Sequence, residues 1–308
     1  MHGLLLVDKP VGLTSHDVVA RVRRLLSTRE VGHSGTLDPL ASGLMVLLIG
    51  EATKLSQYVT EGNKSYEVGL RLGITTDTLD ITGRVLTEKQ IQVSAEDVLA
   101  KALSLTGELQ LPVPIFSAKK IDGKKLYEYA RNNEAVDIPN KQMTFWNIKN
   151  LPSRINAETG SENRSEKVFS LSCSKGSFIR SWVSLLGETL QCGATMSSLI
   201  RTESHQFHLN QAITLEQLEQ KSMPERLQLL IPMDQALPEV KRIRIGGKDQ
   251  ALMKNGQISH QLKIQLISMF NPDLDQIIQI LPEERGQLLA LIGLETGTGF
   301  KIKRVFNC

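Results

Sequence analysis

The sequence has few of the features that mark disulfide-bonded, zinc-binding or secreted proteins. Its 308 residues include three cysteines, Cys173, Cys192 and Cys308, an odd number without a CxxC pair, so we expect neither a disulfide framework nor a structural zinc site. Apolar runs are short: residues 4–7 are followed at once by two charged residues, and no later run reaches membrane-spanning length. We therefore expect a cytoplasmic protein with reduced thiols and no membrane partner.

Motifs for common cofactors are absent as well. The chain has no Walker motif, no GxGxxG between a strand and a helix, no HExxH and no GxSxG. The glycine-rich residues 297–300 lack the helix that must follow a phosphate-binding loop, so they predict a hairpin turn. We expect redox-neutral chemistry that uses no cofactor and no metal.

A strong excess of charge of one sign is also missing. The chain has 36 lysines and arginines against 33 aspartates and glutamates, a formal net charge of +3, which permits a nucleic-acid partner without demonstrating one. Hydrophobic residues make up 41% and charged residues 22%, as in ordinary globular proteins. Because single cores stop growing at roughly 250–300 residues, a chain of this length predicts two domains.

Residues 32–43, GHSGTLDPLASG, present a carboxylate in a loop of restricted conformation. Three glycines and an Asp-Pro pair precede the strand-like run at residues 44–50. Pro39 fixes its own φ and keeps Asp38 out of the helical region, while glycine permits backbone angles closed to other residues. Asp38 is therefore a candidate catalytic carboxylate, and the alternative is that Asp-Pro only starts a turn.

The remaining patterns predict a mixed fold of helices and strands. Ser15 is a candidate cap for a helix with an apolar stripe and a basic face. Residues 64–72 alternate as a strand with Tyr66 on its inward face, where plain core packing is the alternative to a functional role. Four short β-like runs near the C-terminus predict a small β-rich domain and a division into residues 1–238 and 239–308; they are residues 240–246, 263–269, 287–295 and 299–306.

Further candidates for chemistry are two acidic residues and one arginine. Asp77 and Asp80 lie in a polar turn, and a pair of carboxylates is also what a glycosidase uses. Arg180 falls in the first turn of a predicted helix, where a surface ion pair is the alternative. Residues 111–131 combine basic and aromatic side chains, which can bind a phosphate backbone and stack on bases, although a solvated loop has the same composition. These basic groups favour a phosphodiester substrate over a sugar.

Six segments taken in order resemble the TruB family of tRNA pseudouridine synthases. They cover most of the first two hundred residues and are LLLVDKPVGLTS, GHSGTLDPLASG, GEATKLSQY, KSYEVGLRLGITTDTLDITG, SAKKIDGKKLYEYAR and CSKGSFIRS. The resemblance implies an α+β catalytic domain with a central, mostly antiparallel sheet and flanking helices. The residues after about 240 resemble, more loosely, the small PUA RNA-binding domain that follows the catalytic domain in this family.

The resemblance also implies an activity, which is the conversion of uridine 55 in the T loop of tRNA to pseudouridine after base flipping. Asp38 matches the family's catalytic aspartate, a nucleophile or base toward the uracil ring or the sugar. Arg180 matches the arginine that pairs with it, and an adjacent guanidinium favours the charged carboxylate. Tyr66 matches the tyrosine that stacks on the target base and helps to remove its proton.

Other matched positions are expected to bind or support the substrate. His33 matches a histidine that occupies the space left by the flipped base, and Lys9 with Pro10 matches a motif under the active-site floor. Leu199 matches an apolar residue of the base pocket. Phe178 stands where many members have tyrosine.

A second departure from the family pattern is Ile200, where an arginine is common, and both departures put only the details of RNA affinity in doubt. The resemblance implies a stand-alone monomer that acts on the T stem-loop of tRNA without an obligatory protein partner or cofactor. Three alternatives remain open: a guide-RNA-dependent relative within a ribonucleoprotein, a tRNA-binding folding factor without catalysis, and a carboxylate-pair glycosidase.

Overall fold

The computed structural model describes residues 1–152, 165–284 and 287–307, and two β-sheets dominate them. In the larger sheet the strands run in the order β14-β1-β3-β12-β4-β11-β10-β7, with β2 added beside β3 and β13 beside β12. Its strands are β1 (Gly3–Lys9), β2 (Val31–His33), β3 (Ala41–Ile49), β4 (Lys64–Leu72), β7 (Gly107–Pro112), β10 (Asn140–Leu151), β11 (Glu166–Cys173), β12 (Ala194–Ser204), β13 (Phe207–His208) and β14 (Ile213–Thr214).

Neighbouring strands of this sheet are mostly antiparallel. Among the described strands of this sheet, only the pairs β1–β14 and β3–β12 are parallel. The prediction of a central, mostly antiparallel sheet with flanking helices is confirmed. Around it lie α1 (Ser15–Leu25), η1 (Gly50–Leu55), α2 (Ser56–Thr60), α3 (Ala95–Ser104), α4 (Leu126–Arg131), α6 (Ile179–Thr189), η2 (Leu209–Gln211), α7 (Leu215–Gln220), α8 (Met223–Gln228) and η3 (Met233–Gln235).

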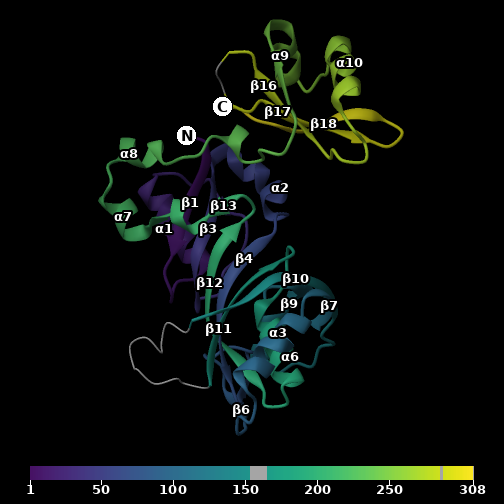
Figure 1. The fold of residues 1–308 in the computed structure, drawn as a ribbon. Coiled ribbons are helices and arrows are strands. Elements are labelled where there is room, and N and C mark those ends of the chain that lie inside the picture. Colours follow the sequence, from purple (N-terminus) through teal and green to yellow (C-terminus); the bar gives the residue numbers. More distant parts are fainter. Residues whose placement is uncertain (153–164, 285–286, 308) are drawn as a thin grey trace.

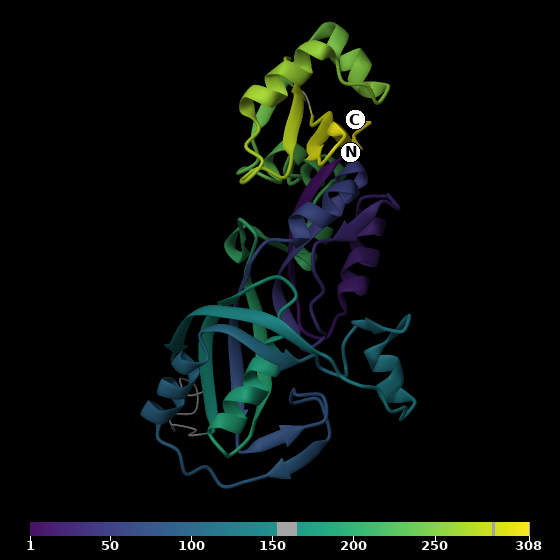
Figure 2. The ribbon, with the colours of Figure 1, turned by 90° about the vertical axis from the view of Figure 1, so that its right-hand side faces the viewer.

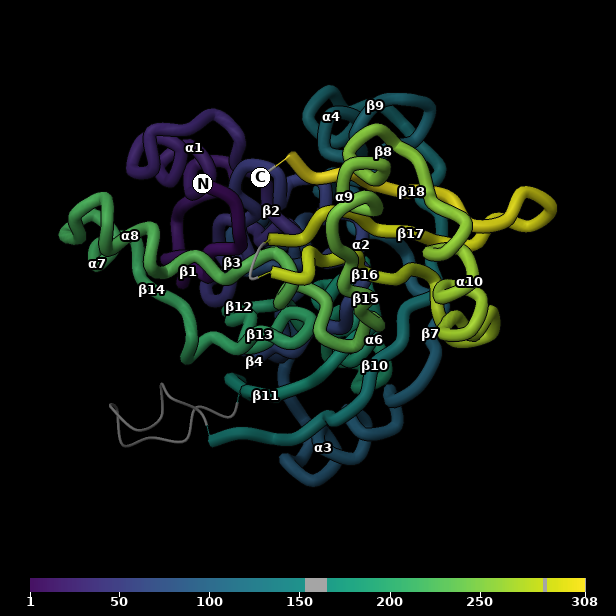
Figure 3. Tube along the Cα trace, turned by 90° about the horizontal axis from the view of Figure 1, so that it is seen from above, coloured from purple at the N-terminus to yellow at the C-terminus, as the bar shows by residue number. Residues whose placement is uncertain are grey.

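Two small hairpins leave the larger sheet. Strands β5 (Ile74–Thr76) and β6 (Val85–Glu88) pair with each other, as do β8 (Lys120–Ile121) and β9 (Lys124–Lys125). The segment with β8, β9 and α4 projects from the body of the molecule in Figure 2, and Figure 3 shows it on the opposite side from α3. The C-terminal part of the basic and aromatic segment predicted at residues 111–131 therefore protrudes from the sheet.

The second sheet lies at one end of the molecule, with both chain termini near its junction with the first (Figure 1). It has the order β15-β16-β17-β18, and β17 and β18 form the hairpin expected at residues 297–300. Its elements are β15 (Arg242–Ile245), α9 (Gly247–Lys254), α10 (His260–Met269), β16 (Ile278–Pro282), β17 (Ala290–Glu295) and β18 (Gly299–Val305). The division of the chain at residues 238 and 239 stays a prediction.

The prediction of a strand at residues 263–269 is wrong, because these residues belong to helix α10. Ser259 caps the helix by accepting a hydrogen bond from Leu262 N, and Leu262 and Leu266 are buried on one face. The exposed face also carries apolar residues, Ile264 and Ile267, so the segment has no clear helical periodicity. A run that is apolar on both faces reads as a strand when only the sequence is considered.

The two sheets share a hydrophobic core. Leu4 and Leu44 of the larger sheet belong to the same buried cluster as Leu281 and Leu291 of the second. A second cluster fills the other face of the larger sheet and packs against α1, α3 and α6. The residues of the site described below lie on strands and helices that border this second cluster.

The described cysteines Cys173 and Cys192 are buried and unpaired, and Cys308 lies outside the described residues. Within residues 1–152, 165–284 and 287–307, no helix is long and apolar enough to cross a membrane.

Candidate active site

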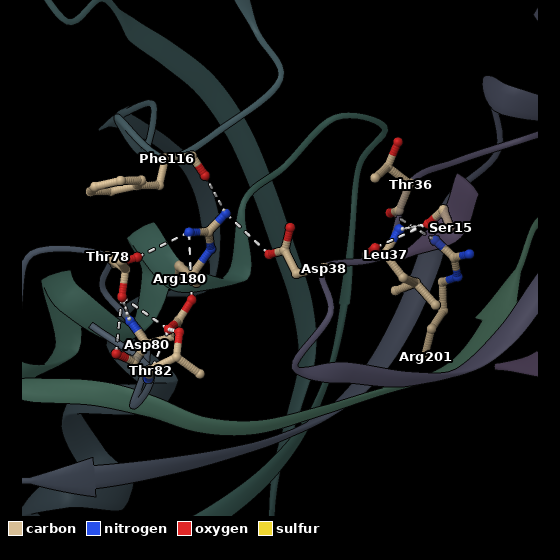
Figure 4. A network of polar contacts seen from close by, with 10 residues as sticks. All are labelled: Ser15, Thr36, Leu37, Asp38, Thr78, Asp80, Thr82, Phe116, Arg180 and Arg201. Carbon is tan, nitrogen blue, oxygen red and sulfur yellow. Dashed lines mark hydrogen bonds and ion pairs between the residues drawn. The ribbon is translucent and has the colours of Figure 1, made fainter. Parts of the chain in front are cut away.

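Asp38 lies in the loop between β2 and β3. Residues at the start of α1 and in the turn before it hold this loop on both sides of Asp38. Ser15 Oγ donates to Leu37 O at 3.0 Å and accepts from Leu37 N at 2.8 Å, as Figure 4 shows. Gly12 N donates to Pro39 O at 2.8 Å. Ser15 therefore does not cap α1 as predicted; Thr14 takes that role, with a capping box, because its hydroxyl accepts from the N3 backbone amide while Ser15 is turned toward the loop.

Arg201 of β12 fixes the same loop from beneath. Its Nε donates to Leu44 O at 2.6 Å, its Nη2 to Gly35 O at 3.2 Å and its Nη1 to Thr36 O at 3.4 Å. The side chain is 1% exposed, so these carbonyl oxygens take the place of water around a buried guanidinium. One side chain thus links the part of the loop before Asp38 to strand β3, which follows the loop.

Arg180, in the first turn of α6, forms an ion pair with Asp38. Its Nη2 lies 3.1 Å from Asp38 Oδ2 and donates to Phe116 O at 2.9 Å. Its Nη1 lies 3.6 Å from Asp80 Oδ2 and donates to Thr78 O at 3.0 Å. These four partners fix the plane of the guanidinium, which in turn fixes the direction of the Asp38 carboxylate. The structure therefore brings together the two residues that the family resemblance implies as partners.

Asp80 sits behind Arg180 and does not line the cavity. Its Oδ1 accepts from Thr78 Oγ1 at 2.9 Å, Thr82 N at 3.0 Å and Thr82 Oγ1 at 2.5 Å. Asp77 accepts from Arg84 N and is also absent from the cavity wall. A glycosidase needs two carboxylates that face the same substrate. Asp38 has no such second carboxylate among the described cavity residues, so the glycosidase alternative is disfavoured.

A cavity of about 470 Å³ opens beside Asp38. Its wall is apolar in part, with Tyr66, Leu199, Phe116, Phe178 and Ile179, and strongly charged elsewhere. The described charged residues that line it are one carboxylate, Asp38, and five cations, Lys64, Lys119, Lys141, Arg180 and Arg201. An excess of positive charge around a concave site attracts an anionic substrate.

Tyr66, Leu199 and Phe178 all lie in the cavity wall, and their roles stay predictions. Tyr66 faces Arg201 across the antiparallel pair β4–β12, and its side chain is 7% exposed. Burial raises the pKa of Tyr66 to about 12, although the nearby Arg201 opposes this shift. The phenol is therefore neutral near pH 7, so Tyr66 can act on a proton only if its own hydroxyl proton moves at the same time.

Lys9 and Pro10 do not line the cavity; they belong to the turn that Gly12 joins to the Asp38 loop by donating to Pro39 O. Lys9 Nζ donates to Pro10 O at 2.8 Å and to Leu13 O at 2.7 Å, which fixes the turn that precedes α1. Burial lowers the pKa of Lys9 to about 8, and the negative charge of Asp38 opposes this shift. Lys9 thus carries a charge at neutral pH in a place where only backbone carbonyls contact its ammonium among the described residues.

His33, at the end of β2, is half-buried and is also absent from the cavity wall. Its Nδ1 accepts from Gly35 N at 3.3 Å, which requires that nitrogen to be unprotonated. Burial, and then the charge of Arg201, lowers the pKa of His33. The imidazole is consequently neutral at pH 7 and braces the loop two residues before Gly35.

Two family models match the chain. One describes the N-terminal domain of the TruB family of pseudouridylate synthases and matches residues 23–179, and the other describes the C-terminal domain of tRNA pseudouridylate synthase B and matches residues 180–238. The chain belongs to the TruB family. Among its relatives, the tRNA pseudouridine synthase B of Bdellovibrio bacteriovorus is 56% identical over 99% of this chain and 97% of that protein. The protein of the same name from Ralstonia nicotianae is 41% identical over 86% of this chain and 82% of its own.

Solved structures share the TruB-family fold at lower identity. A structure described as an H/ACA RNP bound to a substrate RNA containing 2′-deoxyuridine gives a TM-score of 0.67 at 21% identity, and covers 99% of this chain and 85% of that chain. A Cbf5–Nop10–Gar1 complex gives 0.67 at 22% identity with the same coverage. These likenesses establish the fold alone.

Sequence reasoning missed Arg201, which the TruB-family fold places at the centre of the site. The family pattern singles out the neighbouring Ile200 as a departure, whereas Arg201 is a charge within the same strand. Leu199 and Arg201 are two residues apart and both are buried, whereas Ile200 between them is only partly buried. Burying a cation on the inward face of a strand costs free energy unless it has partners. An arginine at such a position in the sequence therefore indicates a residue with a specific structural or functional role.

Proposed function

We propose that this TruB-family chain is a tRNA pseudouridine synthase that isomerises uridine 55 in the T loop. The observation that carries the proposal is that Asp38, fixed by Arg180, is the one carboxylate in a described cavity wall that is otherwise cationic. Uridine in RNA offers a base that fits an apolar and aromatic wall and phosphates that fit the cations. The curated relatives named tRNA pseudouridine synthase B support the same substrate class.

The reaction needs no oxidant and no co-reactant. The bond from C1′ to N1 breaks, a bond from C1′ to C5 forms, the proton on C5 leaves and N1 gains a proton. Arg180 contacts Asp38 through Oδ2, while Oδ1 has no hydrogen-bond partner among the described residues. That oxygen faces the substrate as a nucleophile or base, either toward the uracil ring or toward the sugar.

A base must leave its stack before it can reach Asp38. Flipping costs a few kcal/mol, and stacking on an aromatic face returns roughly 1–3 kcal/mol. Tyr66 supplies that face within the cavity, and Leu199 and Phe178 complete the apolar wall. His33 lies at the start of the Asp38 loop, outside the cavity wall, and its side chain is proposed to fill the gap that the flipped base leaves. Lys9 and Pro10 are proposed to support this loop through the turn before α1.

The projecting hairpin is the proposed second contact with RNA. Lys124 Nζ lies 4.6 Å from the centroid of the Tyr129 ring, and Lys125 Nζ lies 5.3 Å from that of Tyr127, which also lines the cavity. Cations stacked on tyrosines at the edge of a positive cavity can bind phosphates while the rings meet bases. We also propose that residues 239–308, which carry the second sheet, form a PUA-like RNA-binding domain.

We propose that the enzyme acts in the cytoplasm as a monomer, on the T stem-loop of tRNA, without a guide RNA or an obligatory protein partner. The alternative hypothesis is a guide-dependent enzyme. Its support comes from solved structures that resemble this chain only in fold. A folding factor without catalysis would not need a carboxylate locked by an arginine.

The test uses unmodified tRNA transcript and the full-length chain. We expect wild type to form pseudouridine at position 55 by chemical labelling, Asp38→Asn to form none, and Asp77→Asn to match wild type because Asp77 lies off the cavity. Pseudouridine made by Asp38→Asn would refute the assignment of Asp38. Activity that appears only after guide RNA is added would refute the stand-alone proposal.

A further inference from the structure

Lys64 and Arg201 are two buried cations that converge in the wall of the cavity. A Cβ atom placed on Gly35 would lie 3.4 Å from Arg201 Nη1 and 3.4 Å from Lys64 Cε, so both side chains reach the same glycine. Lys64 is 8% exposed and Arg201 is 1% exposed. Both line the cavity that Asp38 faces.

Neither cation has an acidic partner among the described residues. Lys64 Nζ donates to Gly62 O at 2.8 Å and to Thr60 O at 3.2 Å, and Arg201 donates to three backbone carbonyls. Arg180, by contrast, is matched by two carboxylates. Neutral carbonyls satisfy hydrogen bonds but leave the positive charge uncompensated, and buried charges are ordinarily paired.

We propose that Lys64, backed by Arg201, is a subsite for a phosphodiester of the extruded nucleotide. The proposal rests on the proposed function, since a flipped uridine at Asp38 carries its own backbone phosphate to the mouth of the same cavity. Two of the three donor positions on Lys64 Nζ are used, which leaves one for a phosphate oxygen. Arg201 uses one N–H of each of its three nitrogens on these carbonyls, which fixes the guanidinium beside Lys64, where its positive field adds to that of the ammonium.

The charge state of Lys64 gives the subsite a recognisable pH dependence. Burial, followed by the charge of Arg201, lowers the pKa of Lys64 to about 8. The other titratable groups near it are Lys175, Cys173 and His205. Burial raises the pKa of Cys173 to about 12 and lowers that of His205, so both stay neutral from pH 7 to 9.5. Phosphate binding should therefore weaken as pH rises through 8, when Lys64 loses its proton.

The experiment measures binding of unmodified tRNA transcript to the full-length protein in the Asp38→Asn background, which stops turnover. Lys64→Met removes the charge and Lys64→Arg keeps it at every pH, because a guanidinium does not deprotonate. Lys101→Met, on the exposed surface of α3, is the matched control. Lys9, whose pKa is also about 8, is present in all of these proteins and therefore cancels in the comparison.

We expect Lys64→Met to weaken binding at pH 7 by about 10- to 100-fold, the loss typical of a charged hydrogen bond. The slope of log affinity against log salt should fall by about 0.7 for one lost phosphate contact. Binding by Lys64→Arg should remain strong and should decline less than that of the parent between pH 7 and 9.5. Thermal unfolding checks that each variant is folded.

Equal binding by Lys64→Met and Lys101→Met would overturn the proposal, and so would an undiminished pH dependence in Lys64→Arg. The protein with Asp38 intact is assayed for pseudouridine in parallel. If it forms pseudouridine while the Lys64 variants bind normally, only the subsite fails. If it forms none while Lys64→Met loses affinity as expected, the proposed function fails and the phosphate subsite stands.

Discussion

Arg180 and Asp38 form an ion pair whose two partners are unequally buried. The Arg180 side chain is 7% exposed and that of Asp38 is 38% exposed, with 3.1 Å between Nη2 and Oδ2. The arginine is fixed by the protein interior through Thr78 O and Phe116 O. The carboxylate is therefore directed from within while its other oxygen remains open to the cavity, which is the arrangement that a nucleophile or base requires.

Replacement of Arg180 should affect stability and activity separately. Arg180→Met leaves Asp80 buried without its cation, and we expect it to lower the free energy of unfolding by about 3–5 kcal/mol. Arg180→Lys keeps a charge, but one ammonium cannot satisfy Asp38, Asp80 and the two carbonyls together. We expect Arg180→Lys to be more stable than Arg180→Met and yet to form pseudouridine far more slowly than wild type. Urea denaturation measures the stability, and single-turnover assays measure the rate.

A double variant supplies the control for this prediction. Asp80→Asn added to Arg180→Met removes the unpaired buried charge, so part of the lost stability should return while activity stays low. Wild-type rates in Arg180→Lys would show that a single positive charge is enough and that the geometry of the guanidinium is unimportant.

Stability should fall in mild acid because two half-buried histidines have lowered pKa values. Burial lowers the pKa of His33 and of His205 below the ordinary 6.5. Between the lowered pKa of the folded chain and the ordinary pKa of the unfolded chain, the unfolded chain therefore binds more protons than the folded one. Their contribution is therefore complete above pH 6.5 and is lost as pH falls toward the folded-state pKa values.

Urea denaturation at pH 7.5 and pH 5.5 measures this dependence. We expect His33→Gln to reduce the difference in unfolding free energy between the two pH values, and His260→Gln, at an exposed position of α10, to leave it unchanged. An equal difference in His33→Gln and wild type would show that His33 takes up its proton as readily in the folded state as in the unfolded one.

Gly43 and Gly12 permit a matched comparison of strain with steric overlap. Their φ values are +97° and +92°, so alanine is strained at both by roughly 1–2 kcal/mol. A Cβ at Gly43 would also lie 2.5 Å from Arg201 O and 2.8 Å from Arg201 N, whereas nothing lies within 4 Å at Gly12. We expect Gly43→Ala to be clearly less stable than Gly12→Ala.

Activity should follow the same order, because the parallel contact between β3 and β12 positions the Asp38 loop on Arg201. Thermal unfolding and pseudouridine formation are the measurements. Equal losses in the two alanine variants would mean that the backbone of β12 can move away without disturbing the loop.

Local patterns were sufficient wherever a residue's role depends on its neighbours in sequence. Glycines and an Asp-Pro pair marked the Asp38 loop, and strict alternation placed Tyr66 on an inward face, as the structure has it. The same local reasoning failed at residues 263–269, where apolar residues cover both faces of what is a helix. Periodicity identifies an element only when one face differs from the other.

The sequence by itself determined the family, the mixed sheet and the loop that presents Asp38, because these follow from short-range backbone preferences and ordered motifs. Tertiary structure alone decided which backbone carbonyls the buried arginines contact. Arg201 reaches Leu44 across 157 residues, and Arg180 reaches Thr78 across 102. It also placed Lys9, Pro10 and His33 behind the cavity wall and Lys64 within it. Contacts of that range depend on strand order and on the burial of charge, neither of which leaves a local pattern in the chain.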